Sequence, residues 1–190
     1  PRLAWAKIVV AVVLVAGQLL APKVVPILPV ETYIAYAETQ GEQPTTSESK
    51  ELAELPQFYA DMFGWEEKAA AVAEVYNSLS FEERELAAVF GENYGRAGAI
   101  DHFGRELGLP YAISPHNSYW LWGPRRFTGE VVIVLGGDRE ALERSFESVE
   151  LADRVPCRFC MPYESDLPIF VCRDLQLPLA EVWDRLKNYS

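Results

Sequence analysis

The chain of 190 residues carries 28 acidic and 17 basic side chains, which gives it a formal net charge of -11 and a pI near 4.7. This balance excludes nucleic acid as an expected partner, because binding to phosphates needs a basic face. Hydrophobic residues make up 49% of the sequence, which excludes a chain that is disordered throughout.

The first 22 residues predict a transmembrane helix. Residues 8–21 (IVVAVVLVAGQLLA) carry no charge, and the apolar stretch continues back past Lys7. A helix of roughly 20 mostly apolar residues crosses the hydrocarbon layer of a bilayer. Arg2 and Lys7 lie on the N-terminal side of the apolar stretch and Lys23 lies just past its other end, so the excess of basic residues favours a cytoplasmic N-terminal side. We expect a protein of the inner (cell) membrane whose C-terminal domain is extracytoplasmic.

Two further interpretations concern this start. The sequence does not begin with Met and opens directly on the apolar stretch, so we expect the span to be the last one of a longer protein. A cleaved signal peptide is the alternative, because a basic start and a short apolar core are its ingredients. Residues 35–37 (AYA) resemble a cleavage site, but three prolines separate them from the apolar core.

Residues 23–54 predict a Pro-rich and polar linker. Pro22, Pro26 and Pro29 end any helix that leaves the membrane. Residues 39–50 (TQGEQPTTSESK) are almost free of apolar side chains. The extracytoplasmic domain is expected over residues 55–190.

Within that domain, helical periodicity alternates with short apolar runs. Apolar strands that alternate with helices predict an α/β fold, a three-layer sandwich with a mostly parallel or mixed sheet in a Rossmann-like layout. The expected helices are 66–79, a short helix capped by Ser80, 97–107, 138–146 and 179–186, and the expected strands are 86–90, 111–113, 130–135, 148–155 and 169–173.

The loop after the strand 86–90 is the first candidate ligand site. Open α/β sheets bind ligands at the carboxyl ends of their strands, and Glu92, Asn93 and Tyr94 offer groups that bond a polar ligand such as a sugar. The glycines of this loop lack the G-x-G-x-x-G spacing of a dinucleotide site. The alternative is a tight turn that needs glycine for backbone reasons.

Residues 114–124 form the second candidate site, because they place aromatic, amide and imidazole side chains in one short stretch. Such side chains suit a carbohydrate ligand, a membrane interface or an irregular loop packed on the core, and the sequence leaves these three open. The residues concerned are His116, Asn117, Tyr119, Trp120 and Trp122.

Three cysteines, Cys157, Cys160 and Cys172, are candidates for a disulfide, which the expected export favours. Either Cys157 or Cys160 reaches Cys172 if residues 167–168 form a hairpin, and the pairing stays open. The C-x-x-C spacing alone does not predict zinc, since no second pair of ligands follows. The sequence therefore predicts no metal site, no cofactor and no catalytic residue within this domain.

Several separated segments resemble the C-terminal extracytoplasmic domain of bacterial glycosyltransferase family 39 proteins, which are related to protein mannosyltransferases and lipid A aminoarabinose transferases. The resemblance covers most of the chain. The segments are LPQFYADMFGWEEKAAAVAEVYNSL from Leu55, GENYGRAGAIDHFG from Gly91, SPHNSYWLWGP from Ser114, TGEVVIVLGGD from Thr128 and CRFCMPYESDLPIFVCR from Cys157.

The resemblance implies a membrane enzyme that transfers a sugar from a polyprenyl-phosphate donor, served by a divalent metal in the complete protein. The family's catalytic carboxylate lies in an early loop that has no counterpart in this sequence. The implied role is therefore accessory, in recognising or positioning a glycan or protein acceptor. The implied partners are membrane lipid and the transmembrane catalytic part. A non-catalytic binding or assembly module and a free-standing single-pass enzyme are the alternatives.

Overall fold

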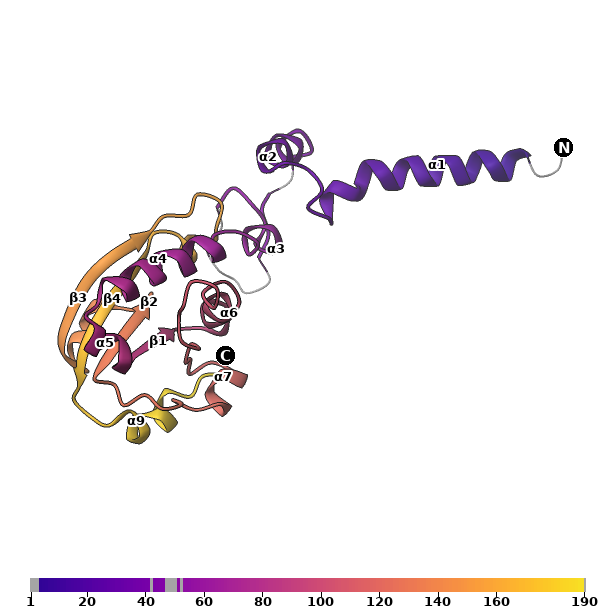
Figure 1. Ribbon diagram of the computed structural model, residues 1–190. Helices are drawn as coiled ribbons and strands as arrows, with labels where there is room; N and C mark the ends of the chain where they lie inside the picture. The colour runs from indigo at the N-terminus through magenta and orange to yellow at the C-terminus, as the bar shows by residue number, and fades with distance from the viewer. Residues whose placement is uncertain (1–3, 42, 47–50, 52, 190) are drawn as a thin grey trace. The chain divides into compact units, whose positions relative to one another are not determined.

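The computed structural model describes residues 4–41, 43–46, 51 and 53–189 (Figure 1). The chain separates into two compact units, Pro1–Asp61 and Met62–Ser190.

The first unit begins with the expected apolar helix. Helical structure over Trp5–Lys23 is long and apolar enough to cross a membrane by length and composition, and its side chains are exposed. Pro22 lies in the 3-10 turn that follows, and Pro29 precedes the next helix. The elements of this unit are α1 (Ala4–Leu20), η1 (Ala21–Lys23), α2 (Val30–Thr39) and α3 (Gln57–Ala60).

Helix α2 lies inside the segment that the sequence predicts as a linker. It forms because tyrosine side chains give it contacts within the first unit. Tyr36 Oη donates to the carbonyl of Leu19 at 3.0 Å, and the rings of Tyr33 and Tyr59 meet edge to face at 5.0 Å. The polar stretch that suggested a linker falls partly outside the described residues, at 42 and 47–50.

The second unit is a mixed α/β structure with a four-stranded sheet (Figure 1). The strand order is β1-β2-β4-β3; β1 and β2 run parallel, and the other two pairs are antiparallel. The sheet is therefore mixed, as expected. Its elements are α4 (Trp65–Ser78), α5 (Phe81–Leu86), β1 (Ala87–Gly91), α6 (Tyr94–Phe103), α7 (Ser118–Leu121), β2 (Val131–Leu135), α8 (Arg139–Glu143), β3 (Phe146–Val155), η2 (Pro162–Glu164), β4 (Leu167–Leu175) and α9 (Leu179–Leu186).

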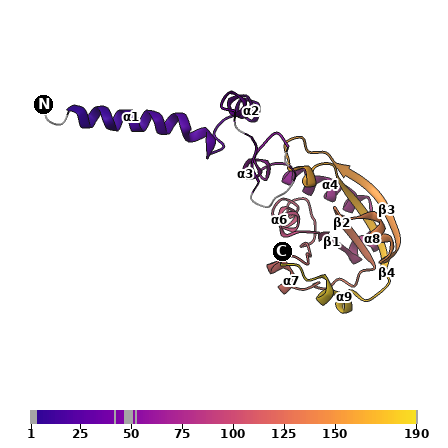
Figure 2. The same ribbon diagram turned by 180° about the vertical axis from the view of Figure 1, so that it is seen from behind.

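The central strands are buried on both faces of the sheet, and their successive residues alternate between these faces, whereas most residues of the edge strand β3 are exposed. Val131, Ile133 and Leu135 of β2 join a cluster with residues of α4 and α6. Val132 and Val134 join a second cluster that contains residues of α9. Figure 2 shows the sheet from behind. Burial on both faces explains why β2 reads as a continuous apolar run rather than an alternating one.

The short helix α5 confirms a capping prediction. The Ser80 side chain accepts from the Glu83 backbone N–H at 3.2 Å, and the Glu83 carboxylate accepts from the Ser80 N–H at 3.1 Å. This reciprocal pair is a capping box, which satisfies two backbone donors at a helix start.

Some boundaries differ from those expected. The predicted strand 111–113 contributes only the bridge of Ile113 to Phe90, because Pro115 follows and has no N–H to continue a ladder. Helix α8 stops at Glu143, since Phe146 already pairs with β4. Helix α6 starts at Tyr94, earlier than expected.

Candidate functional site: a buried ionic cluster at the carboxyl edge of the sheet

Because β1 and β2 are parallel, the loops that follow them lie at the same edge of the sheet. The Glu92 carboxylate joins the two loops. Its Oε2 accepts from Arg96 Nη1 at 2.7 Å and from the backbone N–H of Gly137 at 3.2 Å. The first candidate loop therefore follows a buried strand, β1, and lies beside the loop after β2.

Glu92 is the exposed member of an ionic cluster whose other members are buried, and we define this cluster as Lys68, Glu92, Arg96 and Glu164. Glu164 Oε2 is 3.1 Å from Lys68 Nζ, and its Oε1 accepts from Arg96 Nε at 3.0 Å. The side chains of Lys68, Arg96 and Glu164 are at most 6% exposed. Two cations thus face two carboxylates, so the buried charges are compensated, as burial of charge requires.

Further polar groups complete the cluster. Asn93 Nδ2 donates to Glu164 Oε1 at 3.2 Å, while its Oδ1 accepts from the Arg96 backbone N–H and caps α6. Arg96 Nη2 also donates to the Tyr163 carbonyl at 3.2 Å. The Asn93 side chain therefore serves both as the N-terminal cap of helix α6 and as a partner of Glu164.

Desolvation by burial lowers the pKa of Lys68, and the Glu164 carboxylate opposes this by favouring the ammonium. Arg96 lies nearby and adds to the lowering through charge repulsion. Glu164 accepts from donors of Lys68, Arg96 and Asn93. Its acceptor capacity is therefore used inside the fold. Glu92, whose side chain is 53% exposed, is the member through which the cluster meets solvent.

The backbone at Gly136 is shaped to this cluster. Gly136 has φ +92°, and a Cβ at this position would collide with the Arg96 guanidinium. Glycine is therefore required both for the left-handed backbone and for the close approach of Arg96 to the end of β2.

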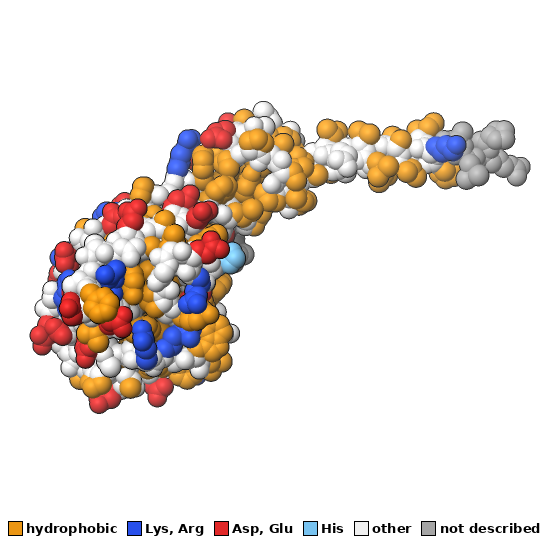
Figure 3. Space-filling model, in the orientation of Figure 1, with side chains coloured by type: hydrophobic (Ala, Val, Ile, Leu, Met, Phe, Trp, Pro, Cys, Tyr) orange, Lys and Arg blue, Asp and Glu red, His pale blue; other side chains and the backbone are white. Residues whose placement is uncertain are grey.

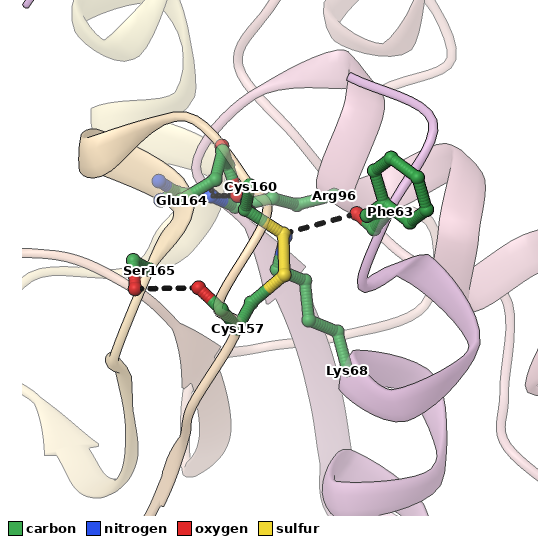
Figure 4. The surroundings of a disulfide bond; sticks show 7 residues. All are labelled: Phe63, Lys68, Arg96, Cys157, Cys160, Glu164 and Ser165. Carbon is green, nitrogen blue, oxygen red and sulfur yellow. Dashed lines mark hydrogen bonds and ion pairs between the residues drawn. A yellow bond between two sulfur atoms is a disulfide. The ribbon is translucent and has the colours of Figure 1, made fainter. Parts of the chain in front are cut away.

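A disulfide joins Cys157 and Cys160 next to the cluster (Figure 4). Cys160 Sγ lies 3.9 Å from Lys68 Nζ and 3.2 Å from the Phe63 carbonyl oxygen. Ser165 Oγ donates to the Cys157 carbonyl at 2.8 Å. The bridge and this hydrogen bond fix the two ends of the loop that carries Glu164, so they help to hold the carboxylate beside Lys68.

The hairpin pairing with Cys172 is wrong for this structure. Cys172 is a free, buried cysteine in the cluster on the α9 side of the sheet, whereas Cys160 packs beside Lys68 of α4. Burial raises the pKa of the Cys172 thiol to about 12. The orientation of alternate residues along β4 is what directs Cys172 away from the bridge.

Some side chains of the second candidate loop pack inside the fold, and others are exposed to solvent. The Trp120 indole donates to the Trp183 carbonyl at 3.1 Å and the Trp183 indole donates to the Trp120 carbonyl at 3.0 Å, which ties α7 to α9. Tyr119 Oη donates to Asp101 Oδ2 at 3.0 Å. The pKa of Tyr119 is raised, chiefly by desolvation and then by the negative charge of Asp101. Trp122 stays 56% exposed and meets the Tyr119 ring edge to face.

The two candidate loops meet through one aromatic contact. The Tyr94 ring packs edge to face against the buried His116 ring at 4.9 Å, while Tyr94 itself is 53% exposed. Asn117 adopts φ +53°, and its backbone N–H donates to the Asn188 carbonyl at 2.9 Å. His116, Asn117, Tyr119 and Trp120 therefore have contacts inside the fold, whereas Glu92, Tyr94 and Trp122 present exposed surface.

Sequence reasoning missed Lys68, Arg96 and Glu164. One signal was available for Lys68: it falls on the helix face that carries Ala69, Val72 and Val75, which are buried. A lysine on an apolar stripe predicts a buried partner, but the partner, Glu164, lies far along the chain. Among the residues that the structure describes, no group of three or more His, Cys, Asp or Glu side chains is arranged to hold a metal ion.

Comparisons of the chain with protein-family models, with curated proteins and with solved structures find no match.

Proposed function

We propose that the chain is a membrane-anchored extracytoplasmic domain that serves a polyprenyl-phosphate-sugar glycosyltransferase in an accessory role. The domain recognises or positions an acceptor, and the sugar transfer itself takes place in the membrane part of the enzyme, where a divalent metal can act. The observation that carries the anchoring is the exposed apolar helix over Trp5–Lys23, whose length matches the hydrocarbon layer.

Two further features support export and an accessory role. The Cys157–Cys160 disulfide suits an oxidising compartment. The buried carboxylate Glu164 is bonded to Lys68 and Arg96, an arrangement typical of a structural ion pair. The transferase part of the proposal rests on the resemblance of the sequence segments alone.

We infer a Rossmann-like three-layer layout for the second unit. A Rossmann-like three-layer layout is supported by the parallel pair β1 and β2 and by the buried clusters on both sheet faces. The antiparallel β3 and β4 depart from an all-parallel sheet. The carboxyl edge of β1 and β2 is then where we expect an acceptor to bind, at the exposed Glu92 and Tyr94.

A non-catalytic binding or assembly module for a glycan or protein partner is the second candidate. The exposed rings of Tyr94 and Trp122 favour it, because aromatic faces supply binding area with little loss of side-chain freedom.

Topology is tested first, with alkaline phosphatase and a fluorescent protein fused in turn to the C-terminal end of the chain in cells. We expect active phosphatase and a dark fluorescent protein. Deletion of residues 4–23 should reverse both signals. A fluorescent C-terminal fusion of the intact chain would contradict the proposed export.

The accessory role is tested with the purified chain in vesicles that contain a polyprenyl-phosphate-mannose donor. We expect no turnover by the chain alone, and loss of transfer when residues 62–190 are removed from the complete transferase in the membrane. Turnover by the chain alone would contradict an accessory role and support a free-standing enzyme. Full transfer without residues 62–190 would favour the binding module.

A further inference from the structure

A second charged region lies apart from the ionic cluster, around the exposed ring of Tyr111. The Arg105 guanidinium lies 4.0 Å from the centre of this ring, and that of Arg125 lies 5.1 Å from it. Tyr111 is 48% exposed. We define the Tyr111 surface as Arg105, Tyr111, Leu121, Trp122, Arg125 and Arg126.

The cations of this surface lack acidic partners. Within the described part of the chain, no carboxylate forms an ion pair with Arg105, Arg125 or Arg126, whereas four other arginines do form such pairs. The paired arginines are Arg96, Arg139, Arg154 and Arg173. Two like charges that share one ring repel each other, so an anion placed between them would be favourable.

Local composition points the same way. Residues 104–127 contain three arginines and one glutamate, in a chain whose net charge is -11. The Arg125 Nε donates to the Ala112 carbonyl at 3.2 Å, which fixes this side chain over Tyr111. Arg125 adopts φ +56°, a conformation that is costly for a residue with a side chain. The basic charge is thus held in place at this surface.

Two large exposed apolar side chains lie close in the chain to Arg125 and Arg126. Leu121 is 68% and Trp122 56% exposed, at the end of α7 and only a few residues before Arg125. Figure 3 shows Lys and Arg side chains beside hydrophobic ones in the part of the unit that carries α7. Exposed aromatic and aliphatic side chains next to arginine are typical of surfaces that contact the headgroup region of a bilayer.

We propose that the Tyr111 surface docks on the anionic headgroups of a lipid bilayer. Arg105, Arg125 and Arg126 bind lipid phosphates, and Leu121 and Trp122 enter the interfacial layer. This inference rests on the proposed membrane anchoring, because the helix α1 keeps the domain close to the bilayer at a high effective concentration. The acidic remainder of the chain is repelled by the same anionic surface, which favours a single orientation.

The test uses the full chain reconstituted in vesicles, with an environment-sensitive NBD fluorophore attached through Ser118→Cys. Ser118 is exposed and opens α7, while Cys172 is buried and the other two cysteines are bridged, so the label reports on the Tyr111 surface. Vesicles contain phosphatidylcholine alone or an equal mixture with phosphatidylglycerol, both with brominated lipid as quencher. Flotation after a high-salt wash measures anchoring independently.

We expect quenching in the anionic vesicles and little in the neutral ones. Raising the salt from 0.1 to 1 M should reverse the quenching, since the Debye length falls from about 10 Å to about 3 Å. Each of Arg105→Gln and Arg126→Gln should lower the ratio of docked to undocked domain about fivefold. The matched control Arg144→Gln removes an exposed arginine outside this surface and should leave the quenching unchanged.

Equal quenching in both lipids, or equal loss in Arg105→Gln and Arg144→Gln, would overturn the inference. A chain that fails to float contradicts the proposed anchoring instead, so the two failures are distinguishable. A chain that floats but is quenched in neither lipid excludes lipid docking and redirects the surface to an acidic protein partner. Thermal unfolding of each variant verifies that it is folded.

Discussion

The ionic cluster at the carboxyl edge of the sheet and the Tyr111 surface both contain several cationic side chains. These side chains are paired with carboxylates in the cluster and exposed on the Tyr111 surface. In the cluster, Lys68 and Arg96 are buried and are neutralised by carboxylates of the same fold. On the Tyr111 surface, Arg105 and Arg125 are exposed and stack on one ring. Charge that is neutralised internally holds segments of the fold together, whereas exposed charge without an acidic partner is available to an external anion.

The largest effect is expected from Glu164→Gln, which removes the carboxylate shared by Lys68 and Arg96. Breaking a buried pair leaves uncompensated charge, so the free energy of unfolding should fall by about 3–5 kcal/mol. Urea unfolding followed by circular dichroism measures this. The control Arg105→Gln removes an exposed charge and should change the free energy of unfolding by less than about 0.5 kcal/mol. Equal losses of unfolding free energy in Glu164→Gln and Arg105→Gln would contradict the difference between the two regions.

A pair of glycine variants sharpens the account of the cluster. Gly136→Ala and Gly137→Ala both place a side chain at positive φ, which costs about 1–2 kcal/mol. Only Gly136→Ala also meets the Arg96 guanidinium, whereas a Cβ at Gly137 makes ordinary contacts. We therefore expect Gly136→Ala to lose about 3 kcal/mol in total, and more than Gly137→Ala, in thermal unfolding. The opposite order would mean that Arg96 moves aside freely.

Loss of the disulfide tests how far the bridge supports the cluster. Because the bridge closes a short loop, its removal by Cys157→Ser with Cys160→Ser should cost about 2 kcal/mol, measured as a lower urea midpoint. A reductant should shift the midpoint of the unchanged protein by the same amount and have no further effect on the double variant. Cys172→Ser should leave the response to reductant intact. If the response to reductant disappeared in Cys172→Ser, the bridge would have to involve Cys172, which would contradict the pairing of Cys157 with Cys160.

The smallest effect concerns a pair that is only partly buried. Hydrogen bonds from Arg173, then from the Ser80 backbone, lower the pKa of Glu83. The pair therefore stabilises the fold above the unfolded pKa near 4.3, and this contribution is lost as the pH falls through the lowered folded pKa. Since solvent screens the pair, we expect roughly 0.3–0.5 kcal/mol.

Urea unfolding at pH 6 and pH 3 should show this decrease in the unchanged protein relative to Glu83→Gln, which cannot titrate. Arg139–Glu143, an exposed i,i+4 pair, gives the control variant Glu143→Gln. A larger acid-range loss in Glu83→Gln than in the unchanged protein would contradict the sign of the pKa change.

Local features of the fold were predictable from the sequence because they depend on neighbours in the chain. The capping box at Ser80 involves residues three positions apart, and the strand 130–135 is marked by β-branched residues and two following glycines. Helices α4 and α9 follow from their periodicity and lie within one residue of the expected bounds.

The ionic cluster was not predictable in the same way. Lys68 and Glu164 are brought together only by the packing of α4 beside the loop that precedes β4. Local patterning does not encode which of the many glutamates meets a buried lysine. The pairing of Cys157 with Cys160, rather than Cys172, likewise depends on which face of the sheet each residue reaches. Long-range register, and not residue type, decides both.

The reciprocal bonds between Trp120 and Trp183 have a practical consequence. They secure α9 over the sheet face that contains the Cys172 thiol, which is fully shielded. Maleimide modification of this thiol would therefore require local opening of the buried cluster to which α9 contributes Leu179 and Trp183. The extent of Cys172 modification, measured by mass spectrometry, would thus report local opening of the protein without any engineered probe.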